Sequence, residues 1–228
     1  MKPYFESDEL SLYHGDCREV LPGLNLSCDL IVTDPPYGTD WQSNRRQQRF
    51  DKIVGDDGSL DVSACLSVAL KKLRRNGHVY IFGEFDFTNL PLTEKAELIW
   101  DKGMMGSGDL ASAWGTSHEK IYFYTYEFSK ANRDKGYGKL AARVRRGSVL
   151  SIPRLNSGAV KRHPTEKPVM LLRQLIESSS IIGDVVLDPF AGSGATLEAA
   201  VLEGRKAIGV EIEEQYCETI VKRFKGES

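Results

Sequence analysis

Four consecutive residues in the first fifth of the chain, Asp34, Pro35, Pro36 and Tyr37, have side chains suited to chemistry on a planar group that carries an amine. The apolar run 30–32 just before them predicts a buried strand, which the prolines cannot continue because they lack an N–H donor. The Asp34 carboxylate and the Pro35 carbonyl are two acceptors in a stiff turn, and Tyr37 adds an aromatic face. Two acceptors and a flat ring suit a nucleobase with an exocyclic NH₂, although Asp-Pro-Pro also occurs in ordinary turns.

A second cluster, late in the chain, predicts a nucleoside site. Residues 185–196 have the pattern of a strand, a turn of small residues and a helix start, with glycines at 192 and 194 that let a backbone approach a ligand closely. Glu211 follows 19 residues after Gly192, at the end of the next predicted strand, where an acid bonds ribose hydroxyls in nucleotide-binding α/β units. The loop lacks the Gly-Lys-Ser/Thr of a phosphate-binding loop, and Leu197 takes the place of the third glycine of the dinucleotide fingerprint. A nucleoside without phosphates, with S-adenosyl-L-methionine as the natural candidate, therefore fits better than ATP or NAD.

The composition of the 228-residue chain is that of an ordinary soluble globular domain, with 41% hydrophobic residues. No apolar run reaches membrane-spanning length, and the N-terminus lacks the apolar core of a signal peptide, so we expect a cytoplasmic protein without a membrane partner. The four cysteines form no Cys-x-x-Cys pair and the four histidines are scattered, so we expect neither a disulfide framework nor a metal site. We expect one domain over residues 1–228.

Positive charge is concentrated in one segment of an otherwise acidic chain. Residues 130–162 hold ten Lys or Arg and a single acid, whereas the net charge of the whole chain is −2. This asymmetry predicts a surface for a polyanion, although a solvated charged loop is the simpler alternative. Residues 129–162 and 40–58 show no pattern of a helix or a strand, and both are positioned where they could contact a nucleic acid. The candidate phosphate contacts are Arg45, Arg46, Arg49, Arg143, Arg145 and Arg146.

The remaining sequence alternates predicted strands with predicted helices. Short apolar runs predict strands at residues 10–13, 30–33, 78–82, 98–100, 121–126, 185–188 and 206–211. Helical periodicity predicts helices at residues 61–73, 168–178, 195–203 and 213–224, with Asp61 as the first N-cap and Asn76-Gly77 closing that region. Strands that alternate with helices predict an α/β fold, a mainly parallel sheet covered by helices on both faces.

Taken together, the two clusters resemble the motifs of the DNA amino-methyltransferases. Asp34-Pro35-Pro36-Tyr37 and the run Phe190-Ala191-Gly192-Ser193-Gly194 are similar to the two core motifs of that family. Residues 163–168, His-Pro-Thr-Glu-Lys-Pro, resemble its segment over the methionine end of the cofactor, and Gly15-Asp16 resembles the pair that contacts the cofactor's adenine. The order, with the catalytic motif first, a basic segment between and the glycine loop last, resembles the circularly permuted β class. The resemblance covers about residues 10 to 224.

The resemblance implies a Rossmann-like fold that depends on S-adenosyl-L-methionine, with a seven-stranded sheet that includes a reversed hairpin. It implies a cofactor site formed by Asp16, Thr165, Lys167, Asp188, Phe190, Gly192, Gly194 and Glu211, and catalysis by Asp34, Pro35, Pro36 and Tyr37. The implied partner is double-stranded DNA with one base flipped out, and residues 129–162 become the candidate target-recognition segment. An aspartate at position 34 favours adenine-N6 methylation, such as restriction–modification systems use, over cytosine-N4, for which Ser-Pro-Pro-Tyr is more typical.

Several alternatives stay open on the sequence. The pocket chemistry also serves cytosine-N4, an RNA base or a protein amide, and a non-catalytic DNA-binding partner subunit would keep the same fold. A homodimer partner is one way for so short a chain to extend its recognition of DNA. His118 and Glu119 precede a strand, and a hydrogen-bonded structural pair is a simpler interpretation of them than an acid–base pair.

Overall fold

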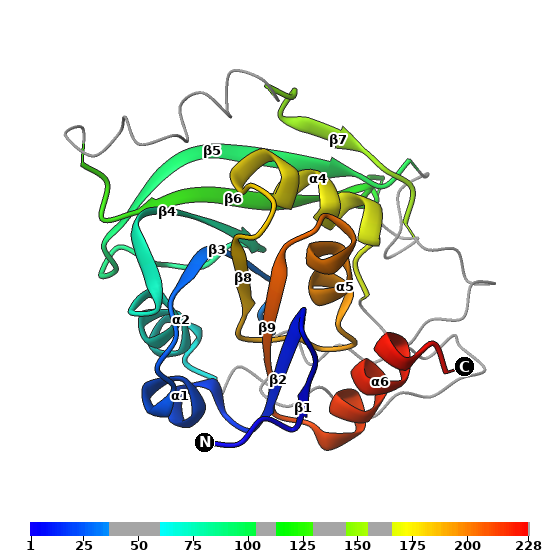
Figure 1. Ribbon diagram of the computed structural model, residues 1–228. Coiled ribbons are helices and arrows are strands. Elements are labelled where there is room, and N and C mark those ends of the chain that lie inside the picture. The colour runs from blue at the N-terminus through cyan, green and yellow to red at the C-terminus, as the bar shows by residue number, and fades with distance from the viewer. Residues whose placement is uncertain (37–59, 104–112, 130–144, 155–165, 228) are drawn as a thin grey trace.

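The structure is a computed structural model that describes residues 1–36, 60–103, 113–129, 145–154 and 166–227 (Figure 1). These residues form one sheet with helices packed on both faces. The strands are β1 (Phe5–Glu6), β2 (Leu10–His14), β3 (Cys28–Thr33), β4 (Leu73–Phe82), β5 (Leu92–Asp101), β6 (His118–Tyr126), β7 (Val149–Ser151), β8 (Val185–Asp188) and β9 (Lys206–Glu211). The helices are α1 (Cys17–Val20), the 3₁₀-helix η1 (Leu21–Gly23), α2 (Val62–Leu70), α4 (Val169–Ser179), α5 (Ala195–Leu202) and α6 (Glu214–Lys225).

The sheet is mainly parallel, as the alternation of elements predicts. Its strand order is β1-β2-β9-β8-β3-β4-β6-β5-β7. Within it, β1 runs antiparallel to β2, and β6 runs antiparallel to both β4 and β5, which is the reversed hairpin. The expected count of seven strands is wrong, because the described residues form nine. The two additional strands, β1 and β7, are edge strands of two and three residues, too short to give a hydrophobic pattern.

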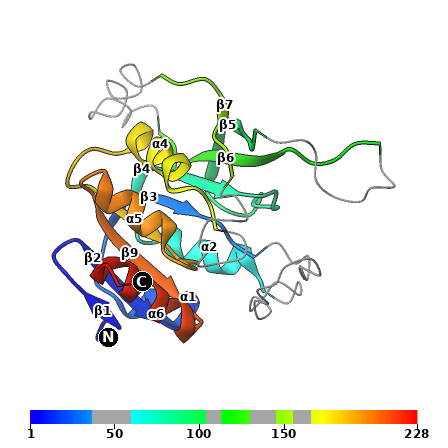
Figure 2. The same cartoon turned by 90° about the vertical axis from the view of Figure 1, so that its right-hand side faces the viewer.

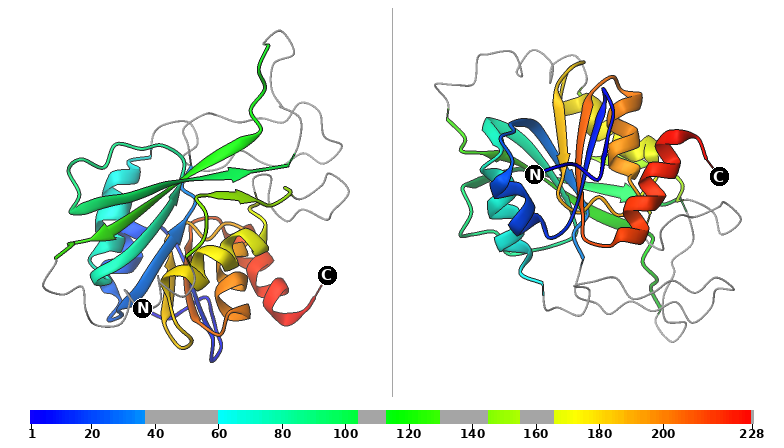
Figure 3. Two further views of the ribbon diagram at one scale, coloured as in Figure 1. Left: turned by 90° about the horizontal axis from the view of Figure 1, so that it is seen from above. Right: turned by 60° about the horizontal axis from the view of Figure 1, so that its bottom comes forward.

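The helices divide between the two faces of the sheet, as Figures 2 and 3 show from other directions. Side chains of successive strand residues point to opposite faces, so β3 contributes to two separate cores. Leu30 and Val32 pack in the core beneath α4, α5 and α6, whereas Ile31 packs in the core beneath α1 and α2. A strand buried on both faces needs the unbroken apolar run that residues 30–32 provide.

The first predicted helix is too long at its end. Asp61 is the N-cap, and its carboxylate accepts a hydrogen bond from the Ala64 amide, but α2 ends at Leu70 and β4 begins at Leu73. Asn76 and Gly77 therefore lie within β4 and do not precede it. Asn76 has a φ of 58°, and the pairing of β3 with β4 shifts register here, so the Asn-Gly pair makes an irregularity in a strand.

Part of the basic segment belongs to the sheet. Residues 149–151, within the stretch expected to be irregular, form β7 and pair in parallel with β5. The indole Nε1 of Trp100 donates a hydrogen bond of 2.7 Å to the carbonyl of Ile152 and ties the end of this strand to the core. Residues 145–148 and 152–154, which are also described, flank β7.

The chain leaves the neighbouring strands β3 and β8 in opposite directions. From β3 it passes through α2 to β4 on one side, and from β8 it passes through α5 to β9 on the other side. In open α/β sheets, the crevice beyond the carboxyl ends of such a strand pair is where ligands bind. Among the described residues, no helix is long and apolar enough to cross a membrane.

Candidate active site

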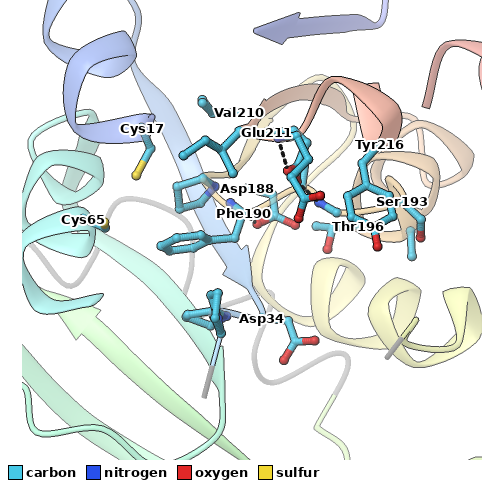
Figure 4. A pocket seen from close by; sticks show the side chains of 18 of the residues that line it. Cys17, Asp34, Cys65, Asp188, Phe190, Ser193, Thr196, Val210, Glu211 and Tyr216 are labelled. Carbon is cyan, nitrogen blue, oxygen red and sulfur yellow. Dashed lines mark hydrogen bonds between the residues drawn. The ribbon is translucent and has the colours of Figure 1, made fainter. Parts of the chain in front are cut away.

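A cavity of about 300 Å³ lies where this topology predicts a site, at the carboxyl ends of four adjacent strands. Each strand delivers one acid: Asp16 follows β2, Glu211 ends β9, Asp188 ends β8 and Asp34 follows β3. Figure 4 shows Cys17 and Cys65 on one side of the cavity and Ser193, Thr196 and Tyr216 on the other, with the Phe190 ring between them. The early and late motifs of the sequence therefore meet in one place.

Glu211 is held by backbone amides. Its Oε2 accepts a hydrogen bond of 2.7 Å from the Gly192 amide, and its Oε1 accepts one of 2.8 Å from the Glu213 amide. Burial raises the pKa of Glu211 to about 7, against these two hydrogen bonds, which lower it. The carboxylate is thus fixed in direction and poised to titrate near neutral pH.

Asp188 lies deeper, at the end of β8. Its Oδ1 accepts hydrogen bonds from the Thr33 hydroxyl at 2.8 Å and from the Phe190 amide at 3.1 Å. Complete burial raises the pKa of Asp188 to about 7, and the hydrogen bond from Thr33 counters part of that rise. Because Thr33 ends β3 and Asp188 ends β8, this bond ties the two strands together at the crevice.

The two glycines of the loop, Gly192 and Gly194, have different roles. Gly192 has a φ of 50° and lines the cavity, where its amide bonds Glu211. Gly194 has a φ of 83°, is the N-cap of α5 and is not among the residues that line the cavity. A Cβ at position 194 would lie 2.9 Å from the Ile220 side chain, so this glycine allows α5 and α6 to pack closely.

Asp16 caps α1 at the rim of the cavity. Its carboxylate accepts hydrogen bonds from the Arg18 amide and guanidinium, which lower the pKa of Asp16. The donor atoms of Asp16, Cys17 and Cys65 lie within 4.8 Å of one another, a grouping that could hold a metal ion. The hydrogen bond between the two thiols and burial raise the pKa of Cys17, whereas the same hydrogen bond lowers the pKa of Cys65, so the thiolate that a metal requires is disfavoured at Cys17. Asp16 is already bound to Arg18, and both cysteines line the cavity.

Asp34 is paired with a buried lysine. The Lys167 Nζ lies 2.6 Å from Asp34 Oδ2 and 3.3 Å from Glu119 Oε2, and the lysine side chain is only 6% exposed. Burial lowers the pKa of Lys167, but attraction to the two carboxylates outweighs it and the net change is upward. The other oxygen of Glu119 lies 2.7 Å from the Lys102 Nζ. Three distant parts of the chain therefore meet around one ammonium group.

The lining of the cavity suits a cationic nucleoside. Of its described lining residues only Lys167 is basic, whereas seven are acidic: Asp16, Asp34, Glu119, Glu166, Asp188, Glu211 and Glu213. Such an excess of carboxylates attracts a positively charged ligand and opposes phosphate groups. The Phe190 ring offers an apolar face to a nucleobase. The residues present thus fit S-adenosyl-L-methionine, with its sulfonium and ammonium charges, better than a nucleotide.

Most of the predicted site residues in the described part of the chain meet in this cavity. They are Asp16, Asp34, Pro35, Pro36, Lys167, Asp188, Phe190, Gly192 and Glu211. Tyr37, Arg45, Arg46, Arg49, Arg143 and Thr165 lie outside the described residues. Arg145 is exposed, and the Arg146 guanidinium forms an ion pair with Glu177 of α4. Both arginines remain predicted DNA contacts.

Four residues of the site were not predicted from the sequence: Glu119, Thr33, Cys17 and Cys65. Glu119 lines the cavity and pairs with Lys167 and Lys102, although it comes from the start of β6, far from both motifs in sequence. No local pattern predicts which strand lies beside β4, so its position could not be found from the sequence. Thr33 did carry a signal, because a polar residue that ends an apolar strand beside Asp34 needs a hydrogen-bond partner.

Comparison with known proteins identifies the family of the chain. The DNA methylase family model matches residues 28–222 of the chain. The DNA adenine methyltransferase YhdJ of Escherichia coli (strain K12) is 28% identical over 96% of this chain and 84% of its own length. TTHA0409 from Thermus thermophilus, complexed with S-adenosyl-L-methionine, has a TM-score of 0.67 at 25% identity and covers 96% of this chain and 95% of its own.

A structure with a different base specificity shares the fold. The cytosine-N4-specific PvuII DNA methyltransferase has a TM-score of 0.68 at 20% identity, covering 98% of this chain and 89% of its own. The family model spans most of the chain and includes both motif regions, from β3 to α6. The prediction of family is therefore confirmed: this chain belongs to the N6/N4 family of DNA methylases.

Proposed function

We propose that the chain transfers a methyl group from S-adenosyl-L-methionine to the N6 amine of an adenine flipped out of double-stranded DNA. The observation that carries this proposal is the meeting of Asp34 with Asp188 and Glu211 at one cavity. A site for an amine-bearing base and a site for a cationic nucleoside are then neighbours, as direct transfer between the two requires. The adenine specificity that YhdJ carries in its name supports the choice of base.

The exocyclic amine of adenine is a poor nucleophile because its lone pair is delocalised into the ring. In the proposed complex, the Asp34 carboxylate and the Pro35 carbonyl accept the two N–H hydrogens of that amine. These bonds favour a tetrahedral nitrogen whose lone pair points into the cavity, and they stabilise the positive charge that develops there. When bound, S-adenosyl-L-methionine would supply a methyl group on a sulfonium centre: the N6–C bond forms as the S–C bond breaks, the neutral thioether S-adenosyl-L-homocysteine leaves, and the methylated amine then loses one proton to water.

The cofactor-binding residues have separate proposed tasks. Glu211 accepts hydrogen bonds from ribose hydroxyls, Phe190 packs against the adenine, and Asp16 bonds its polar edge. Gly192 lets the loop approach closely, and the family resemblance assigns Thr165 and Lys167 to the segment over the methionine end of the cofactor. Gly194 acts indirectly, by fixing the N-terminus of α5 against α6.

A base inside a duplex cannot reach this cavity, so the target nucleotide must be flipped out, and Tyr37 would stack on it. Residues 129–162 and the arginines at 45, 46 and 49 are the proposed contacts to phosphates and base edges. We propose that the protein acts in the cytoplasm, and that a homodimer would supply a second DNA-binding surface.

Nucleoside analysis after methyl transfer tests this function. The protein is incubated with labelled S-adenosyl-L-methionine and unmethylated duplex DNA, the same sequences as RNA, or a protein mixture. We expect label in N6-methyladenine from the duplex, absent with Asp34→Ala. Label in N4-methylcytosine would overturn the choice of base, and label in RNA or protein would overturn the choice of substrate. Cofactor binding without transfer to any of them would favour a non-catalytic partner subunit.

A further inference from the structure

We propose that Lys167 is a positioning residue for Asp34, and that Glu119 holds this lysine in place. The inference rests on the proposed function and refines it, because the family resemblance assigns Lys167 to the cofactor. The structure gives it different partners: its Nζ contacts Asp34 Oδ2 at 2.6 Å and Glu119 Oε2 at 3.3 Å. The Lys167 ammonium also lies 5.0 Å from the centre of the Phe82 ring, at the end of β4.

The lysine cannot turn easily to another partner. With 6% of its side chain exposed, it has little access to water, and a buried ammonium group is stable only when it is paired. Its two neighbours in sequence are also held. Glu166 forms an ion pair with Arg223 of α6 in which both side chains are buried, and Pro168 is the N-cap of α4. Lys167 thus lies between two residues that are themselves held, Glu166 by α6 and Pro168 at the start of α4.

The contact with Asp34 has a consequence for catalysis. One oxygen of the carboxylate is bound to a fixed cation, which restrains the position of that oxygen, while an ionised carboxylate has the capacity to accept further hydrogen bonds, such as one from an amine. A carboxylate paired with an ammonium group is also a weaker base. The pairing therefore favours a role for Asp34 as an ionised acceptor that orients the amine, over a role as the group that removes its proton.

Glu119 competes with Asp34 for the positive charge of Lys167, so the charge of Asp34 is only partly compensated. It shares Lys167 with Asp34, and its other oxygen is bound at 2.7 Å by Lys102. Asp188 adds a further carboxylate that interacts with Asp34. Among the described residues, the charged groups around Asp34 include Lys167 from the segment before α4 and Asp188 from β8, with Glu119 of β6 on the other side of the lysine.

The test compares Lys167→Met, Lys167→Arg and Glu119→Gln with the control Lys120→Met. Lys120 is the next residue of β6, but its ion pairs are with Glu84 and Glu97, outside the cavity. We expect kcat of Lys167→Met to fall about 100-fold, the size of loss that a misplacement of about 1 Å at a catalytic group causes. Lys167→Arg should recover part of that loss, Glu119→Gln should lose less than Lys167→Met, and Lys120→Met should match the wild type.

Two further readouts separate positioning from cofactor binding and from simple loss of structure. Cofactor Kd, measured by calorimetry, should stay within about threefold of the wild-type value in Lys167→Met, because the lysine acts on Asp34. The acid limb of the kcat profile should move to higher pH, because Asp34 has lost its cation. A large rise in cofactor Kd with unchanged kcat would make Lys167 a cofactor ligand and overturn the proposal.

Circular dichroism and the melting temperature report whether each variant folds. If Lys167→Met does not fold, the kinetics of Glu119→Gln and Lys167→Arg decide the test. A wild-type protein that transfers no methyl group would refute the proposed function separately. The positioning claim would then be decided by crystal structures of the wild type and Lys167→Met. An Asp34 carboxylate in the same orientation in both would overturn it, and a displaced carboxylate in the variant would support it.

Discussion

The cavity holds its carboxylates in two different ways. In the cofactor half, formed by Asp188, Glu211 and the glycine loop, backbone amides and a threonine hydroxyl donate to the carboxylates. In the amine half, formed by Asp34, Glu119 and Lys167, a buried ammonium group binds both carboxylates. In the first arrangement the negative charge of the carboxylates is not paired with a lysine of the described residues, so a cationic ligand would stabilise it. In the second arrangement Lys167 already supplies the positive charge. The hydrogen-bond and ion-pair partners of a carboxylate therefore decide whether it suits ligand binding or catalysis, even when all the carboxylates lie at one edge of the sheet.

The largest effect on the cofactor half should come from Glu211→Ala. We expect cofactor affinity to fall about 100-fold, because two hydrogen bonds from ribose hydroxyls to a charged acceptor are lost, each stabilising by about 1.5 kcal/mol or more. Calorimetry with S-adenosyl-L-methionine measures the change. Glu214→Ala, an exposed glutamate in the first turn of α6, is the matched control and should bind as the wild type does. Equal affinity in Glu211→Ala would remove this residue from the site.

Gly194→Ala should destabilise the fold of the cofactor half. An alanine at a φ of 83° is strained, and its Cβ would approach the Ile220 side chain to 2.9 Å. We expect a loss of about 2 kcal/mol in the free energy of unfolding, measured by urea denaturation. Gly147→Ala, where an added Cβ meets no atom within 4 Å, should leave stability nearly unchanged. Equal stability in both variants would contradict the packing role of Gly194.

Cofactor binding should depend on pH near neutrality. Burial raises the pKa of both Asp188 and Glu211 to about 7, so these groups are neutral below that pH and ionised above it. A cationic ligand favours the ionised forms, so affinity should rise with pH and be about tenfold weaker at pH 6 than at pH 8. Glu211→Gln should flatten the profile. A wild-type Kd that is constant over this range would show that the cofactor half does not titrate there.

The smallest effect is expected outside both halves, in the basic segment. Replacing Arg143, Arg145 and Arg146 by glutamine should weaken DNA binding about threefold to tenfold and reduce its salt dependence, because fewer phosphates are neutralised. Cofactor affinity should not change. Arg146 should contribute least of the three, because its guanidinium is already paired with Glu177. Unchanged DNA affinity and salt slope in the triple variant would exclude this segment as a phosphate contact.

The parts of the site that could be predicted from the sequence are those marked by a pattern of neighbouring residues. The apolar run before Asp34 and the strand–loop–helix pattern around Gly192 predicted two strand ends and the acids they carry, and a parallel sheet brings such ends to one edge. The short edge strands β1 and β7 were missed because two or three residues have no periodicity. The pairing of Lys167 with Asp34 and Glu119 joins residues 133 and 48 positions apart, and only the order of strands in the sheet brings them together.

The most direct test of the account is the rate of single-turnover methyl transfer to unmethylated duplex DNA by Asp34→Ala, with cofactor Kd measured on the same preparation. We predict a rate at least about 1,000-fold below that of the wild type, because the fixed acceptor for the amine is lost, with a cofactor Kd within about twofold. An Asp34→Ala protein that transfers methyl at the wild-type rate would contradict the assignment of the amine half. A variant that loses cofactor binding would contradict the division of the cavity into two halves.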